Sequence, residues 1–156
     1  MTLKQGTPAP AFQLPHQPGE MIDLSEYLGK KKILLLFFPL SFSSVCTTEM
    51  CTMRNSWAQW EKLDAAIFGI TVDSPFVTAK FRQEENIPFP VLSDFNKEVA
   101  KTYGVLYEEF HGFKGVPKRS AFVIGTDKKI HYAWSSDDSS IQPDYETLKT
   151  AVTQAP

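Results

Sequence analysis

The sequence is short of the residues from which metal sites and disulfide frameworks are built. Its 156 residues include two cysteines and three histidines, and no histidine has ligand spacing to the cysteines, so a zinc site is poorly supported. A chain of this length buries roughly two thirds of its unfolded surface and folds without covalent staples. We therefore expect no metal and no cofactor, and the two cysteines need another explanation.

Long apolar runs and a surplus of charge are also missing. The main apolar run, residues 33–38, is far shorter than the roughly 20 residues of a membrane span. A net charge of −2 gives no basic footprint for nucleic acid or an acidic membrane. The first twenty residues lack the apolar core of a secretory signal. We expect a soluble, cytoplasmic protein that binds neither nucleic acid nor membranes.

What the chain does have is an alternation of short apolar segments and helical patterns. The alternation predicts an α/β fold, a helix-covered sheet that a final hairpin makes mixed. Without repeats or linkers, residues 1–156 are expected to form one domain. The expected strands are 30–38, 65–72, 89–94, 120–125 and 129–136, and the expected helices are 44–63, 75–85, 96–103 and 143–152.

Both cysteines lie in the predicted helix that follows the first buried strand. Open α/β sheets bind ligands at such strand-to-helix turns, and Ser43 or Ser44 is the expected N-cap. Cys46 then falls in the first turn, where unpaired N–H groups and the helix dipole favour a thiolate. It also begins an apolar stripe at helical spacing, which is typical of a buried helix face. A working thiol and a packed core residue both remain open interpretations.

Cys51 lies about 7.5 Å further along an ideal helix than Cys46 and about 140° around it. The separation exceeds what a disulfide tolerates, so the two cysteines cannot bond while the helix is intact. If they join, the first turns must unwind, which is the behaviour of a redox cycle. Cys51 is therefore interpreted either as a redox partner of Cys46 or as an inert bystander.

The motifs around these cysteines resemble those of the peroxiredoxins. "PLSFSSVC", residues 39–46, matches the P-x-x-x-(T/S)-x-x-C of that family, and "CTTEMCTMRN", residues 46–55, is similar to the segment that follows it. "GVPKRSAFVIG", residues 115–125, is similar to the family's arginine before an apolar strand and singles out Arg119. The similarity continues in order over nearly the whole chain, from "GTPAPAFQL" to "KKIHYAW".

The resemblance implies a thioredoxin-like fold, with a central mixed β-sheet flanked by helices, and a thiol-dependent peroxidase. Carried over position by position, Cys46 would attack the peroxide and become a sulfenic acid. Ser43 would donate a hydroxyl hydrogen bond to the peroxide, and Arg119 would be the cation beside the thiolate. Pro39 would shield the pocket.

The resemblance also assigns supporting residues and a subgroup. Glu49 and Arg54 would form a polar pair that helps to orient Arg119. The C-x-x-x-x-C spacing resembles the bacterioferritin-comigratory or Q-type peroxiredoxins, in which the second cysteine, here Cys51, resolves the first within one chain. "TVDSP" and "CTMRN" also resemble the E-type alkyl hydroperoxide reductases, some of which use one cysteine.

The partners implied are a peroxide, either hydrogen peroxide or an alkyl hydroperoxide, and a thioredoxin-like or small-thiol reductant. A monomer and a homodimer are equally compatible with the sequence. The alternative from another class is a redox-regulated thiol sensor or interaction protein on the same fold, which would be oxidised without efficient turnover. The glycine-broken segment Tyr103 to Lys118 is a candidate active-site loop.

Overall fold

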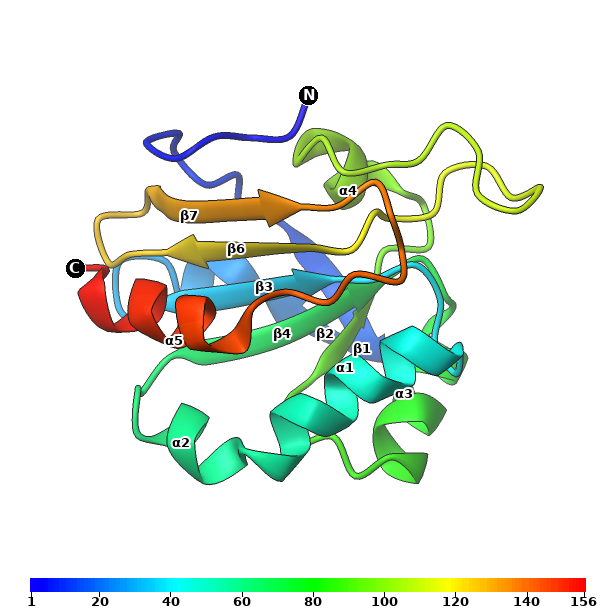
Figure 1. Ribbon diagram of the computed structural model, residues 1–156, viewed down its shortest axis with the longest axis horizontal. Coiled ribbons are helices and arrows are strands. Elements are labelled where there is room, and N and C mark those ends of the chain that lie inside the picture. Colours follow the sequence, from blue (N-terminus) through cyan, green and yellow to red (C-terminus); the bar gives the residue numbers. More distant parts are fainter.

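A five-stranded mixed sheet forms the centre of the computed structural model, which describes all 156 residues (Figure 1). The strand order is β5-β4-β3-β6-β7. β3 is parallel to β4 and β4 to β5, whereas β6 is antiparallel to both β3 and β7. The predicted α/β architecture with a mixed sheet is therefore confirmed. The strands are β3 (Ile33–Phe37), β4 (Ala66–Thr71), β5 (Val91–Ser93), β6 (Ser120–Ile124) and β7 (Ile130–Ser135).

β3 is the middle strand, and all five of its residues are buried. Successive side chains of a strand point to opposite faces of the sheet. Leu34 and Leu36 accordingly belong to one apolar cluster, while Leu35 and its neighbours at positions 33 and 37 belong to a second. This strand is apolar throughout because both of its faces pack against a core.

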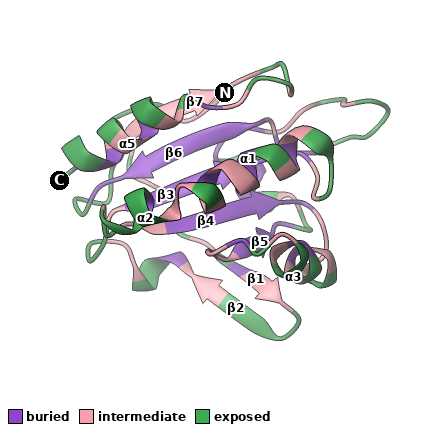
Figure 2. Cartoon of the chain, turned by 60° about the horizontal axis from the view of Figure 1, so that its bottom comes forward, coloured by how far each residue is buried: buried purple, intermediate pink, exposed green.

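The helices divide between these two clusters. α1 (Ser44–Asn55) and α5 (Tyr145–Gln154) contribute to the cluster of Leu34, and α4 (Glu98–Thr102) contributes to the other. Figure 2 shows the inner strands buried while the outward sides of α1 and α5 are exposed. α3 (Pro75–Glu84) contacts β5 at the sheet edge.

Apart from shifts of one to three residues at element ends, the structure differs from the predicted elements in two places. The helix expected over 44–63 is interrupted at Ser56, where α1 ends and α2 (Trp57–Glu61) begins. Ser56 leaves the helical conformation (φ −109°, ψ 20°), and its hydroxyl donates back to the Thr52 carbonyl at 2.9 Å. Such back-bonding by serine competes with regular helix structure.

The second difference is an N-terminal hairpin that the Pro-rich sequence concealed. β1 (Gln13–Gln17) pairs antiparallel with β2 (Glu20–Asp23), and a 3₁₀ turn, η1 (Leu24–Glu26), follows. The pairing shifts register between Pro15 and Gln17. Proline cannot donate to a strand ladder, so it is confined to edges, strand starts and irregular positions such as this one.

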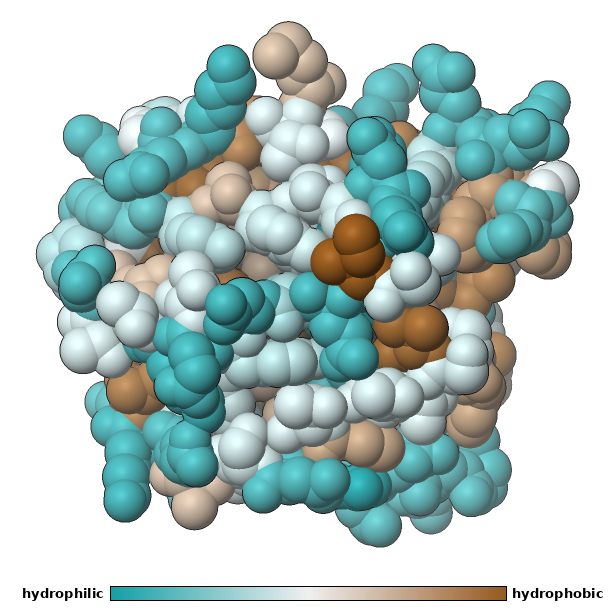
Figure 3. Space-filling view, viewed as in Figure 1, coloured by the Kyte–Doolittle hydropathy of each residue, from teal (hydrophilic) through white to brown (hydrophobic).

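The face shown in Figure 3 is mostly hydrophilic or neutral, with a few hydrophobic side chains right of centre. None of the helices has the length and apolar character needed to cross a membrane. The large hydrophobic residues that are at least half exposed are Met1, Met21, Phe42, Phe76, Phe95, Phe113 and Ile141.

Candidate active site

Cys46 is the third residue of α1, and its side chain faces inward. The residue is only 1% exposed, and it packs in the apolar cluster with Met50 and Met53. Its Sγ lies 3.2 Å from Nη2 of Arg119. Cys46 is therefore part of the buried stripe, as one interpretation predicted, and its role as a working thiol stays a prediction.

The turn before α1 sets where Cys46 falls. Ser43 is the N-cap, with the extended backbone (φ −72°, ψ 152°) that this position requires. Its side chain does not cap the helix, because Oγ donates to the Leu40 carbonyl at 2.7 Å. Phe42 next to it has φ of +67°, a left-handed conformation that is rare for a bulky side chain. The Ser43 hydroxyl is thus exposed at the helix start, outside the buried contact of Cys46 and Arg119.

Arg119 directly precedes β6 and joins three separate groups through its guanidinium. Nη2 contacts Cys46 Sγ, Nη1 donates to Glu49 Oε1 at 2.7 Å, and Nε donates to the Ser139 carbonyl at 3.1 Å. The planar fork of arginine can serve several acceptors at fixed angles, which a lysine cannot do. Because the residue is 1% exposed, these contacts fix its cation beside the thiol.

Neighbouring groups keep the guanidinium of Arg119 protonated. Burial alone lowers the pKa of a guanidinium, but the negative charges of Glu49 and Cys46 outweigh that effect, so the pKa of Arg119 lies above its ordinary value. Arg119 therefore places a full positive charge 3.2 Å from the sulfur of Cys46. The site therefore holds a buried thiol in direct contact with a cation.

Glu49 is fully buried one helical turn after Cys46. One carboxylate oxygen, Oε1, accepts from Arg119, whereas Oε2 has no hydrogen-bond partner. Burial raises the pKa of Glu49 to about 7, although the attraction of Arg119 lowers it. Burial therefore favours the neutral carboxyl, and the contact with Arg119 favours the carboxylate.

Pro39 lies in a turn that is tied to the end of β4. Its carbonyl accepts from Thr71 Oγ1 at 3.2 Å, and the backbone N–H of Ser41 donates to Asp73 Oδ2 at 2.7 Å. Thr71 Oγ1 also contacts Asp73 Oδ2 at 3.0 Å. Pro39 is buried, so this network fixes the chain that leads into α1.

The predicted pairing of Arg54 with Glu49 is wrong. Arg54 Nη1 donates to the carbonyl of Glu85 at 2.7 Å and lies 4.0 Å from Glu85 Oε2. Residues five apart on a helix are separated by about 140°, so Glu49 turns toward the core while Arg54 turns toward the end of α3. Of the two predicted supporting residues, only Glu49 reaches Arg119.

Cys51 is partly buried on another side of α1 from Cys46. Both thiols are free, and both lie within one unbroken helix, as predicted. Cys51 Sγ donates to Glu85 Oε2 at 3.5 Å. Burial and this hydrogen bond raise the pKa of Cys51, and the nearby charge of Arg54 opposes them.

The candidate loop that follows Tyr103 is not joined to the cysteine by hydrogen bonds. It makes no hydrogen bond to Cys46, Glu49 or Ser43, and it is held by contacts such as that of the Tyr107 hydroxyl with the Asp137 carbonyl. Its structural effect is to lead the chain into Arg119. Its part in the active site stays a prediction.

Sequence reasoning missed two contributors to the site, Ser139 and Glu85. Ser139 contributes a main-chain carbonyl to Arg119, and no side-chain pattern could have indicated that contact. Glu85 contacts both Cys51 and Arg54 from the C-terminal end of α3. The only available signal was its place at the end of a predicted helix.

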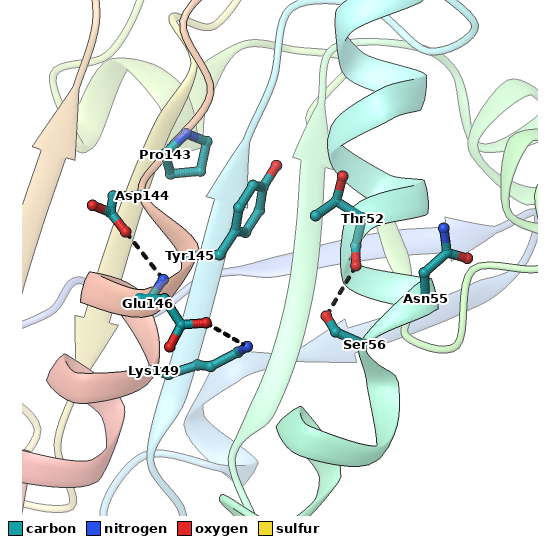
Figure 4. A pocket seen from close by; sticks show the side chains of 8 residues that line it. All are labelled: Thr52, Asn55, Ser56, Pro143, Asp144, Tyr145, Glu146 and Lys149. Carbon is teal, nitrogen blue, oxygen red and sulfur yellow. Dashed lines mark hydrogen bonds and ion pairs between the residues drawn. The ribbon is translucent and has the colours of Figure 1, made fainter.

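An open, polar hollow lies between the end of α1 and the start of α5 (Figure 4). Thr52 lines it from α1 and Ser56 from the break after α1, while Tyr145 and Lys149 line it from α5. None of the residues that contact Cys46 lines this hollow. It still adjoins the site around the buried thiol, since burial and the nearby charge of Glu49 raise the pKa of Tyr145, which lines the hollow.

Comparison with known proteins decides the family. The family model described as AhpC/TSA family matches residues 5–133. The chain belongs to this family. The putative peroxiredoxin bcp of Coxiella burnetii is 35% identical over 137 residues, covering 86% of this chain and 89% of the relative. Peroxiredoxin Bcp of Escherichia coli is 32% identical over 141 residues, covering 88% of this chain and 89% of the relative.

A solved structure agrees with these relatives. The crystal structure of Peroxidoxin BcpB from Mycobacterium tuberculosis superposes with a TM-score of 0.85 at 30% identity, covering 96% of each chain. The thioredoxin-like fold of the peroxiredoxins is thereby confirmed for this chain. As an AhpC/TSA peroxiredoxin of the Bcp (bacterioferritin-comigratory) type, it is a thiol-dependent peroxidase whose substrate is a peroxide. The alternative of a sensor without turnover is accordingly not favoured.

Proposed function

We propose that this peroxiredoxin reduces hydrogen peroxide or alkyl hydroperoxides with Cys46 as the attacking thiol, and that Cys51 resolves the product within the same chain. The observation that carries the proposal is the contact of Arg119 Nη2 with Cys46 Sγ at 3.2 Å, in a guanidinium that Glu49 holds from the other side. No other cysteine competes for either role, since the sequence has only these two.

In the first step, the Cys46 thiolate attacks one oxygen of the peroxide. The S–O bond forms as the O–O bond breaks, giving a sulfenic acid and an alkoxide or hydroxide that takes up a proton. Arg119 and the backbone N–H groups at the start of α1 stabilise the negative charge that moves to the leaving oxygen. Ser43 donates to the bound peroxide once its hydroxyl leaves the Leu40 carbonyl, to which it donates in the free protein. Pro39 shields the reacting sulfur from bulk water.

In the second step, the Cys51 thiol attacks the sulfenic sulfur and forms a disulfide, releasing water. This step requires the first turns of α1 to unwind, and several features make that helix start weak. It has no side-chain cap and no acidic residue in its first turn. Thr48 and Thr52 each donate back to the carbonyl four residues earlier, at 2.9 and 2.8 Å, which destabilises helices slightly.

An external thiol then reduces the disulfide and restores both cysteines. We assign this step to a thioredoxin-like protein or a small thiol of the cytoplasm, where such reductants keep thiols reduced. Cys46, Cys51 and Arg119 all belong to one chain, so the cycle runs equally in a monomer or a homodimer.

Intact mass spectrometry tests the proposal. One equivalent of hydrogen peroxide should remove two hydrogens from the reduced wild-type chain, whereas Cys51→Ser should gain one oxygen. Oxygen gain in the wild type would show that Cys51 is a bystander and that an outside thiol resolves Cys46. If neither protein changes mass rapidly, Cys46 is not the attacking thiol.

A further inference from the structure

The thiol of Cys51 is held by a residue outside α1. Glu85 follows α3 as its C-cap, and its Oε2 accepts from Cys51 Sγ at 3.5 Å. The Glu85 side chain is 29% exposed, so the contact lies at the rim between α1 and α3. The attack on peroxide does not use this contact, because Arg119, Glu49 and Ser43 all lie elsewhere.

We infer that the Glu85 carboxylate acts as a latch on the resolving thiol, because it keeps Cys51 protonated and attached to α3. Opening of the contact between Glu85 and Cys51 then limits how fast the Cys46 sulfenic acid becomes a disulfide. The inference rests on the proposed function of Cys51 as the resolving cysteine. It makes Glu85 a positioning residue for the second chemical step.

The chemistry of the contact supports a latch. A carboxylate accepts hydrogen bonds but cannot donate them, so Glu85 stabilises the thiol form and repels the thiolate. Burial of Cys51 acts in the same direction, and both raise the pKa of this thiol. Because the thiolate is the nucleophile, Cys51 is a poor nucleophile while the contact lasts.

A second tie keeps the carboxylate in position. Arg54 Nη1 donates to the Glu85 carbonyl at 2.7 Å and lies 4.0 Å from Glu85 Oε2. The guanidinium is a strong donor and S–H is a weak one. When the first turns of α1 unwind, the weak Cys51 contact therefore breaks first, while Arg54 still anchors the end of the helix.

The latch sets a competition at Cys46. The sulfenic sulfur can be attacked by Cys51, which is oxidised as that sulfur is reduced, with the Cys51 proton and the sulfenic hydroxyl leaving as water. It can instead react with a second peroxide molecule and become a sulfinic acid, which is not readily reversed. A slower release of Cys51 favours the second route, so Glu85 makes the enzyme more sensitive to excess peroxide.

Glu85→Gln tests the latch because it removes the charge and keeps the shape. Loss of the negative charge beside the thiol should speed disulfide formation about two- to fivefold at pH 7. It should also lower the yield of sulfinic acid at high peroxide by a similar factor. Stopped-flow tryptophan fluorescence measures the rate of disulfide formation, and intact mass measures the yield of sulfinic acid. The rate at which Cys46 reacts with peroxide should not change. The matched control is Glu84→Gln, whose exposed carboxylate pairs with Lys80 on the same helix.

A separate readout follows the thiol itself. With Cys46→Ser in the background, the pH profile of Cys51 alkylation should move to lower pH in Glu85→Gln and stay in place in Glu84→Gln. An unmoved profile, or disulfide formation that is unchanged or slower in Glu85→Gln, overturns the latch. Absence of an intrachain disulfide in the wild type overturns the resolving role of Cys51 instead, and the alkylation profile still decides whether Glu85 holds the thiol.

Discussion

The two thiols of this chain lie on one helix but in different kinds of surroundings. Cys46 is 1% exposed and contacts Arg119, which is itself fixed by Glu49 and the Ser139 carbonyl. Cys51 is only partly buried and makes one weak contact, to Glu85. One thiol is therefore built into a rigid charged network, and the other is attached by a bond that can open.

The difference suits the two steps assigned to the two residues. Attack on peroxide gains from groups that are already in place when charge develops, because they need no reorganisation. Resolution requires Cys51 to leave its position, so a strong contact there would slow it. A spacing of five residues separates the two surroundings, since it places the side chains about 140° apart around α1.

The largest expected effect comes from removing Arg119, which belongs to the rigid network around Cys46. In Arg119→Ala, the reaction of Cys46 with hydrogen peroxide should slow by about 10²- to 10³-fold, because a preorganised cation beside the reacting atoms is lost. Stopped-flow fluorescence of the reduced protein gives this rate constant directly.

A matched arginine controls for charge and helix contacts. Arg54→Ala removes a guanidinium that contacts Glu85 but does not reach Cys46 or Glu49. Its rate of reaction with peroxide should stay within about twofold of the wild type, since no group near the reacting sulfur is lost. Equal slowing in both variants would mean that the two arginines act together, as the sequence-based assignment held.

This contrast also shows what the sequence could reveal. The position of Cys46 in a first helical turn after a buried strand follows from local patterns, and those patterns were sufficient. The partner of Arg54 was not predictable, because it depends on where the end of α3 packs against α1. The Ser139 contact was equally hidden, since a main-chain carbonyl carries no side-chain signal.

The same reasoning explains the fold. β3 was recognisable because an uninterrupted apolar run that follows three lysines leaves few alternatives for a chain of this size. The hairpin of β1 and β2 was missed because it lies in a Pro-rich stretch, where only pairing with a neighbour makes the backbone a strand. Elements defined by their own periodicity were predicted, and elements defined by their partners were not.

A second, smaller effect should appear in the pH dependence of stability. Glu49 has a pKa of about 7 in the fold, against an ordinary value of 4.5, because burial favours the neutral carboxyl. The protonated form therefore contributes stability that is complete below about pH 4.5 and is lost as the pH rises through about 7. This loss should be on the order of 1–3 kcal/mol in the free energy of unfolding.

Glu49→Gln isolates that contribution, because its amide does not titrate. Urea unfolding of the reduced proteins at pH 4.5, 6 and 7.5 should show the wild type losing stability relative to Glu49→Gln as pH rises. If the wild type instead gains stability over this pH interval, the attraction of Arg119 exceeds the cost of burying Glu49. Glu49 and Arg119 then form a fully charged pair beside Cys46.

The smallest expected effect concerns α1, the helix that must unwind before Cys51 can react with Cys46. Thr48 is exposed on α1, and its hydroxyl donates to the Ser44 carbonyl at 2.9 Å. Thr48→Ala removes a β-branched residue and this competing bond, which should stabilise the helix by about 0.5 kcal/mol. Disulfide formation should then slow about twofold, while the reaction with peroxide keeps its rate.

Thr102→Ala is the matched control for that change. Thr102 is an exposed threonine of α4 whose hydroxyl donates to the Glu98 carbonyl at 2.8 Å, the same bond in a helix that contains neither thiol. Rapid mixing with peroxide followed by acid quench and mass analysis separates the two steps in each variant. Slower disulfide formation in Thr48→Ala alone would tie resolution to the opening of α1, whereas equal rates in both would mean that release from Glu85, and not unwinding of the helix, controls when Cys51 reacts.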